Sequence, residues 1–125
     1  MTTVLTYDLA GSRYVNLTNA CNLRCHFCPR TGGDYRLGAL DLRLHSQPDT
    51  EAFLPRLQQL DGIDEVVFCG YGEPTARLSA LLRIGQYVRR RGVPVRLNTN
   101  GLGNLINATD IVPLLATAVD SVSVS

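Results

Sequence analysis

Three cysteines that lie close together are the residues of this sequence best suited to chemistry. Cys21, Cys25 and Cys28 fall within eight residues, whereas Cys69 lies far along the chain. Two disulfides would have to bridge this cluster internally and to Cys69, which is sterically awkward at such short separations, because bridged cysteines need a defined separation of their Cα atoms. Thiolates at this spacing can instead converge on one small object, each holding one iron of a cubane cluster and leaving the fourth iron without a protein ligand. An open metal position of this kind leaves room for a substrate.

Other interpretations of the cysteine cluster stay open at this point. A structural zinc site would need a fourth ligand, which His26 could supply, although its place next to Cys25 favours a side chain that points away. An electron-transfer cluster would use Cys69 as the fourth thiolate. Otherwise Cys69, among apolar neighbours, is expected to be a small buried apolar residue. Chance clustering of buried cysteines is the remaining alternative.

A second group of candidates directly follows an apolar run. These residues are Gly70, Tyr71, Gly72, Glu73 and Pro74. Gly70 and Gly72 permit positive φ and let the backbone approach a ligand closely. Glu73 can face a cation such as an ammonium group. A glycine turn alone is weak support, since most such turns are only turns, and its place beside the cysteine loop raises its value.

Amides and hydroxyls form the third group. Asn98 and Asn100 belong to the stretch Asn98-Thr99-Asn100-Gly101, and Ser123 and Ser125 close the chain. An Asn-Gly turn after a strand is common, and the serines are equally well explained as outward-facing strand residues. Their value as site residues depends on whether the fold brings them together with the first two groups.

Strand-like and helix-like segments alternate along the chain, and this order predicts that the three groups meet. The expected strands are 13–18, 65–69, 94–97 and 121–124, and the expected helices are 48–60, 77–91 and 107–118. Strands joined through helices pair in parallel by right-handed crossovers. The fold class is therefore α/β, a parallel sheet of repeated βα units, and such folds place ligand chemistry at the carboxyl ends of the strands. The long connection 19–47, which carries the cysteines, is of a length typical of functional loops.

Composition excludes several classes of protein. The chain has 125 residues, enough for a single domain, and a net charge of +1, which gives no broad basic surface for nucleic acid. The longest strongly apolar stretch, 111–119, is far shorter than the roughly 20 residues of a membrane span. The first residues lack the pattern of a signal peptide, so a cytoplasmic location is expected. Glu51, Asp61, Asp64 and Glu65 are expected to be ordinary surface or cap charges.

The sequence resembles the radical S-adenosylmethionine (SAM) superfamily. Cys21-x3-Cys25-x2-Cys28, with an aromatic residue before the last cysteine, is similar to the defining cluster motif of that family. Gly72-Glu73-Pro74 is similar to its glycine-glycine-glutamate-proline motif, with Tyr71 where the first glycine usually stands. Details around 16–19 and 69–75 resemble a branch associated with TatD-type nucleases, and a branch similar to 7-carboxy-7-deazaguanine synthase is the second candidate.

The resemblance implies a [4Fe–4S] cluster on the three cysteines, with SAM bound to the unique iron. It also implies that the turn from Gly70 to Pro74 contacts the methionine ammonium, and that Asn98, Asn100 and Ser123 contact the ribose or the methionine end. The reaction implied is reductive cleavage of SAM to a 5′-deoxyadenosyl radical that abstracts hydrogen from an unknown substrate, with an electron donor such as flavodoxin or ferredoxin. The alternative is a metal-binding module, an electron-transfer cluster or a Cys3His zinc site, without radical chemistry.

The family fold adds an expectation about completeness. A single radical SAM core domain over residues 1–125 is expected, in the form of a partial (β/α)6 TIM-like barrel covering about four strands. We interpret the ending after the fourth strand as a C-terminal truncation, with a two-chain assembly as the alternative. Such a fragment is expected to hold the cluster motif and to turn over poorly.

Overall fold

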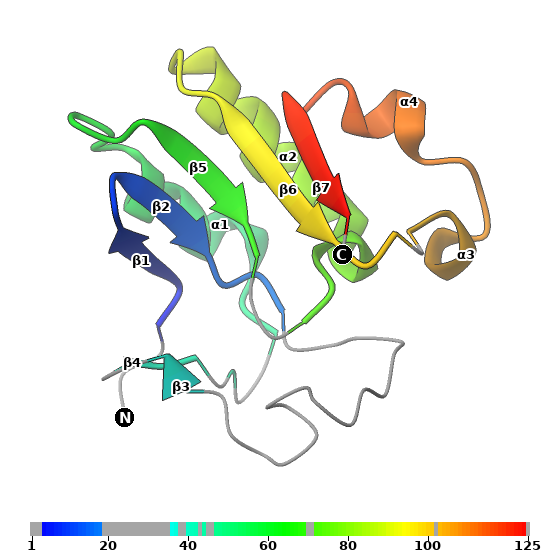
Figure 1. Ribbon diagram of the computed structural model, residues 1–125, viewed down its shortest axis with the longest axis horizontal. Coiled ribbons are helices and arrows are strands. Elements are labelled where there is room, and N and C mark those ends of the chain that lie inside the picture. The colour runs from blue at the N-terminus through cyan, green and yellow to red at the C-terminus, as the bar shows by residue number, and fades with distance from the viewer. Residues whose placement is uncertain are drawn as a thin grey trace.

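The computed structural model describes residues 4–18, 36–37, 40–42, 44, 47–69, 72–101 and 103–124. Its centre is a sheet of five strands in the order β1-β2-β5-β6-β7 (Figure 1). The strands are β1 (Thr6–Leu9), β2 (Ser12–Val15), β5 (Glu65–Phe68), β6 (Val95–Thr99) and β7 (Ser121–Val124). The last four are parallel, and β1 is antiparallel to β2. The predicted α/β class with parallel strands is confirmed, and the closed geometry of a barrel stays a prediction.

The helices lie behind the strands and beyond the β7 edge of the sheet in Figure 1. They are α1 (Thr50–Phe53) with the 3-10 turn η2 (Leu54–Leu57), the 3-10 turn η3 (Pro74–Arg77) with α2 (Leu78–Arg90), α3 (Gly103–Asn107) and α4 (Val112–Leu115). Their apolar side chains, among them Phe53, Leu81 and Ile84, pack on Phe68 and Leu97 of the sheet in one buried cluster. Burial of this helix-side face is the main hydrophobic contribution to the fold. None of the helices in the part of the chain that is described has the length and apolarity required to cross a membrane.

Four predicted elements differ from the structure by more than their first or last residue, and one of them is the strand expected over 94–97, which is β6 at Val95–Thr99. The helix expected over 48–60 forms α1 and then a 3-10 turn, because Pro55 has no N–H to continue an α-helical ladder. The helix expected over 107–118 is wrong: α3 ends at Asn107, Ala108 has a φ of 57°, and α4 begins afresh at Val112. The first strand begins one residue early, at Ser12, and ends at Val15 instead of reaching Thr18.

Two strand pairs are additional to the predicted order. β1 and β2 form a hairpin whose two-residue turn, Ala10-Gly11, has a positive φ at both positions, as in a type I′ turn. The sequence does not predict this turn, because alanine, which stands at position 10, rarely adopts a positive φ. The short strands β3 (Arg36–Leu37) and β4 (Leu40–Asp41) pair within the long connection.

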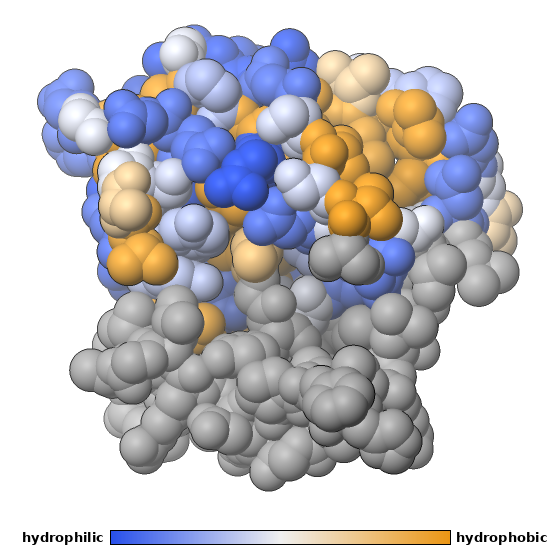
Figure 2. Space-filling model, viewed as in Figure 1, coloured by the Kyte–Doolittle hydropathy of each residue, from blue (hydrophilic) through white to orange (hydrophobic). Residues whose placement is uncertain are grey.

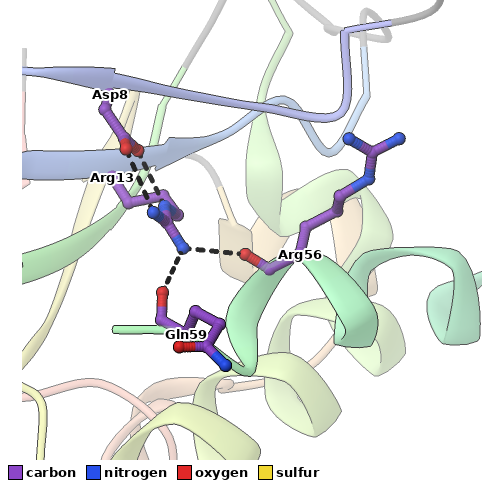
Figure 3. A network of polar contacts seen from close by, with 4 residues as sticks. All are labelled: Asp8, Arg13, Arg56 and Gln59. Atoms are coloured by element: carbon purple, nitrogen blue, oxygen red, sulfur yellow. Dashed lines mark hydrogen bonds and ion pairs between the residues drawn. The ribbon is translucent and has the colours of Figure 1, made fainter. Parts of the chain in front are cut away.

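Arg13 joins this hairpin to the first helical segment (Figure 3). Its guanidinium donates to both carboxylate oxygens of Asp8, at 2.7 and 3.0 Å. Its Nη1 also donates to the carbonyl oxygens of Arg56, at 3.0 Å, and Gln59, at 2.7 Å. The hydrogen bond from Arg13 is the chief reason that the pKa of Asp8 lies below its ordinary value. One planar side chain therefore satisfies a strand carboxylate and two orphan carbonyls at a helix end.

Replacement of Arg13 by lysine should destabilise the chain although it keeps the charge. An ammonium group cannot reproduce the planar fork, so we expect a loss of roughly 1–2 kcal/mol in the free energy of unfolding, measured by urea denaturation. Arg83→Lys is the matched control, because the pair of Arg83 with Glu51 has side chains 54% and 67% exposed. Equal midpoints for Arg13→Lys and the wild type would contradict the assigned role.

Candidate functional site

The candidate site residues that the structure describes lie at one edge of the sheet. Because β5, β6 and β7 are parallel, their carboxyl ends meet there. Glu73 follows β5, Asn98 and Asn100 lie at the end of β6, and Ser123 lies in β7 as the register partner of Asn98. Cys21, Cys25, Cys28, Gly70 and Tyr71 are outside the described residues, so their roles stay predictions.

Glu73 is the most deeply placed of these residues, with only 3% of its surface exposed. Its Oε2 accepts hydrogen bonds from the backbone N–H of Thr75, at 3.0 Å, from the Thr75 hydroxyl, and from the Thr99 hydroxyl, at 2.7 Å. Its Oε1 accepts from the backbone N–H of Asn100, at 2.7 Å. A carboxylate has about four lone-pair sites, so most of its accepting capacity is used inside the chain.

Thr75 and Thr99 are partners of Glu73 that the sequence did not predict. Both are buried, at 1% and 8% exposure, with their hydroxyls on the same carboxylate oxygen. The available signal was a threonine two residues after Glu73 and another at the end of the next strand. That signal is weak, because threonine is also an ordinary strand residue.

The network continues into α3. The side-chain amide of Asn107 donates to the carbonyl oxygens of Thr75, at 3.0 Å, and Gly103, at 2.8 Å. Gly103 lies so close to Thr75 that a Cβ on it would be 3.1 Å from the threonine side chain, and 2.6 Å from the Ile111 side chain. The loop after β5 is thereby fixed to the loop after β6 and to the helix that follows.

The sheet face opposite the helices carries several polar side chains. Ser12, Glu65, Arg96, Asn98 and Ser123 lie on it together with Tyr14 and the buried Val67, and Figure 2 shows hydrophilic residues over the middle strands of this face. Parallel sheets usually have apolar side chains on both faces, because both faces are covered. We call this surface the helix-free face, because none of the helices that the structure describes packs on it.

An ion pair organises the helix-free face. Arg96 donates from Nε and Nη2 to the two carboxylate oxygens of Glu65, at 3.1 and 3.0 Å. Ser12 donates to Glu65 at 2.7 Å, and Arg96 donates from Nη1 to the Asn98 side-chain oxygen at 3.1 Å. The expectation that Glu65 is an ordinary surface or cap charge is wrong, since its side chain is 29% exposed and accepts three hydrogen bonds from Arg96 and Ser12. A cross-strand contact of this kind depends on register, which sequence spacing does not show.

The Glu65 pair predicts a pH dependence of stability. The hydrogen bonds from Arg96 and then Ser12 hold the pKa of Glu65 below its ordinary value of 4.5. A carboxyl group with a lowered folded-state pKa stabilises the fold above its unfolded-state pKa, and that contribution is lost as the pH falls through the folded-state pKa. Urea midpoints should therefore fall less for Glu65→Gln than for the wild type between pH 7 and pH 3. The loss of unfolding free energy between pH 7 and pH 3 should differ between the two proteins by less than about 1 kcal/mol, because the pair is partly solvated. Identical pH profiles would contradict the assignment.

Cys69 is partly exposed and is a free cysteine, which corrects the expectation that it is buried. Among the residues that the structure describes, no group of three or more histidine, cysteine or acidic side chains is placed to hold a metal ion. The three thiolates of the cysteine motif, which lies outside the described residues, are the donor type that holds iron–sulfur clusters.

A small apolar cavity of about 150 Å³ lies behind the same strand ends. Its walls come from the ends of β6 and β7 and from α3 and α4, and they include Thr75, Thr99, Ile111, Leu115 and Val124. The cavity is apolar although two threonines line it, which agrees with their hydroxyls being used by Glu73.

Comparison with known proteins gives two findings. A family model described as "Radical SAM superfamily" matches residues 15–125. The chain is also 32% identical, over 90 residues, to the tungsten-containing aldehyde ferredoxin oxidoreductase cofactor-modifying protein of Pyrococcus furiosus. This match covers 70% of the present chain and 23% of the relative, so the chain spans about a quarter of that protein. No solved structure matches.

Proposed function

Because the chain belongs to the radical SAM superfamily, we propose that it binds a [4Fe–4S] cluster through Cys21, Cys25 and Cys28 and binds SAM beside it. The donor set fits such a cluster, since three thiolates at this spacing leave one iron open. With both groups bound and one electron supplied by a donor such as flavodoxin or ferredoxin, the site would cleave SAM to methionine and a 5′-deoxyadenosyl radical that abstracts hydrogen from a substrate.

The observation that carries the proposal is the meeting of the predicted SAM contacts at one edge of the sheet. Asn98 and Ser123 are register partners on neighbouring strands, and Asn100 follows directly. The turn 70–74 contributes Gly72 and Glu73 at the same edge, and in the proposal its backbone faces the methionine ammonium. These groups bind and orient SAM by hydrogen bonds from a rigid strand edge.

We place the substrate over the helix-free face. The name of the P. furiosus relative says that it modifies a cofactor, and a polar substrate of that general kind would match the donors and acceptors of Arg96, Asn98 and Ser123. A barrel that continues beyond β7 would enclose this face. The proposal includes membership of the TatD-associated branch, which the residues around 16–19 and 69–75 resemble.

Anaerobic reconstitution tests the proposal. We expect about four irons and four sulfides per chain, together with a reduced-cluster electron paramagnetic resonance signal that changes when SAM is added. One zinc per chain without sulfide would identify the alternative, a metal-binding module. The assay reads cluster and SAM binding directly, so it does not depend on turnover by a chain that spans part of its relative.

A further inference from the structure

The carboxylate of Glu73 joins two loops that the strand edge presents to a ligand. It accepts from Thr75 on its own loop and from Thr99 and Asn100 on the neighbouring one. We propose that Glu73 is a positioning residue: it braces the loop after β6 against the turn after β5, and this brace, and not contact of its carboxylate with SAM, sets the affinity for SAM. This inference rests on the proposed function and names the role of one residue in it.

Burial and bonding commit this carboxylate to the protein. With 3% exposure and four intramolecular donors, Glu73 has little surface left for a ligand. Within the described part of the chain, its partners are N–H and O–H donors of Thr75, Thr99 and Asn100. Four hydrogen bonds from two loops converge on this one side chain, as a structural brace requires.

Thr99 carries the brace onward along the second loop. Its hydroxyl donates to Glu73 at 2.7 Å and accepts from the backbone N–H of Gly101 at 3.2 Å. The Asn100 N–H also donates to Glu73, so the Glu73 carboxylate holds three successive residues, 99 to 101, directly or through Thr99. Gly101 has a φ of 85°, so the chain turns sharply just where the brace ends.

The position of Asn100 therefore depends on Glu73. Asn100 is a predicted contact of SAM, and its backbone is fixed by the 2.7 Å bond to Oε1. Misplacement of a binding group by about 1 Å is enough to weaken productive binding strongly. Thr99 has no predicted contact with SAM. A substitution of Thr99 should nevertheless weaken SAM binding, because it displaces Asn100.

Thr99→Val, Thr99→Ser and Glu73→Gln test the inference on the reconstituted chain. Valine keeps the shape of threonine but leaves the Gly101 N–H and the carboxylate without their partner, whereas serine keeps the hydroxyl. We expect Thr99→Val and Glu73→Gln to bind SAM about tenfold more weakly at unchanged iron content, and Thr99→Ser to bind within about twofold of the wild type. Thr109→Val, at an exposed position, is the control and should bind normally. Affinity is read from the SAM-dependent change in the electron paramagnetic resonance signal.

Direct contact of the carboxylate with SAM makes a different prediction. In that case Glu73→Gln weakens binding while Thr99→Val does not, and this result overturns the brace. Amide hydrogen exchange in the absence of SAM gives a second readout: Asn100 should exchange about tenfold faster in Thr99→Val and in Glu73→Gln than in the wild type. Unchanged exchange in both variants also overturns it. Wild-type protein that holds no cluster and binds no SAM counts against the proposed function, while the exchange experiment still decides the brace.

Discussion

Cys25→Ala should abolish cluster binding. Cys25 is the middle cysteine of the motif, and two thiolates together with His26 do not form the ligand set of an iron–sulfur cluster of this type. Iron and sulfide after anaerobic reconstitution are expected to fall from about four per chain to near zero, with loss of the visible charge-transfer absorption. SAM binding should be lost with the cluster, because the open iron supplies its anchor.

Cys69→Ala is the matched control for this prediction. Cys69 is partly exposed and lies directly after β5, outside the motif. Its removal should leave iron and sulfide at the wild-type level. Loss of the cluster in this variant would instead place Cys69 in the ligand set and support the electron-transfer alternative, in which four thiolates leave no iron open.

Gly85→Ala should destabilise the fold, although alanine is the better helix former. In an exposed helix this change gains about 1 kcal/mol. Gly85 lies in α2, and a Cβ there would be 2.5 Å from the carbonyl oxygen of Ala118 and 2.9 Å from its Cβ. The contact is with backbone, which cannot rotate away, so α2 or the segment before β7 has to move. We expect a net loss of roughly 1–3 kcal/mol in the free energy of unfolding, measured by urea denaturation.

Ser79→Ala provides the comparison within the same helix. Ser79 is exposed in α2, so alanine should be neutral or slightly stabilising there. A Gly85→Ala variant as stable as Ser79→Ala would show that α2 and Ala118 are not in close contact.

The elements that the sequence predicted well are those with strong hydrophobic patterns. The strand from Glu65, the helix that ends at Arg90 and the strand Ser121–Val124 lie within about one residue of their predicted bounds, and the parallel pairing of the strands followed from their alternation with helices. The prediction of one helix over 107–118 failed although the apolar residues have helical spacing, because Ala108 has a positive φ that interrupts the helix.

The candidate site divides along a similar line. Motif residues such as Glu73 and Asn100 are recognisable in sequence, because their types and their places after strands are local features. The partners that give Glu73 its role were hidden, since Thr99 and Asn100 are 26 and 27 positions away and meet it only through sheet register. The Glu65–Arg96 pair, 31 positions apart, was hidden for the same reason.

The separation of the two sheet faces has a consequence for how such a chain diversifies. The side chains of Ser121 and Ser123 on the helix-free face are exposed and take no part in the apolar cluster that holds the helices. Exchanges at these positions should therefore cost little folding free energy, since surface substitutions usually fall within about 0.5 kcal/mol. Substitutions that change substrate specificity can therefore accumulate on the helix-free face, while selection for the stability of the fold acts on the face that packs against the helices.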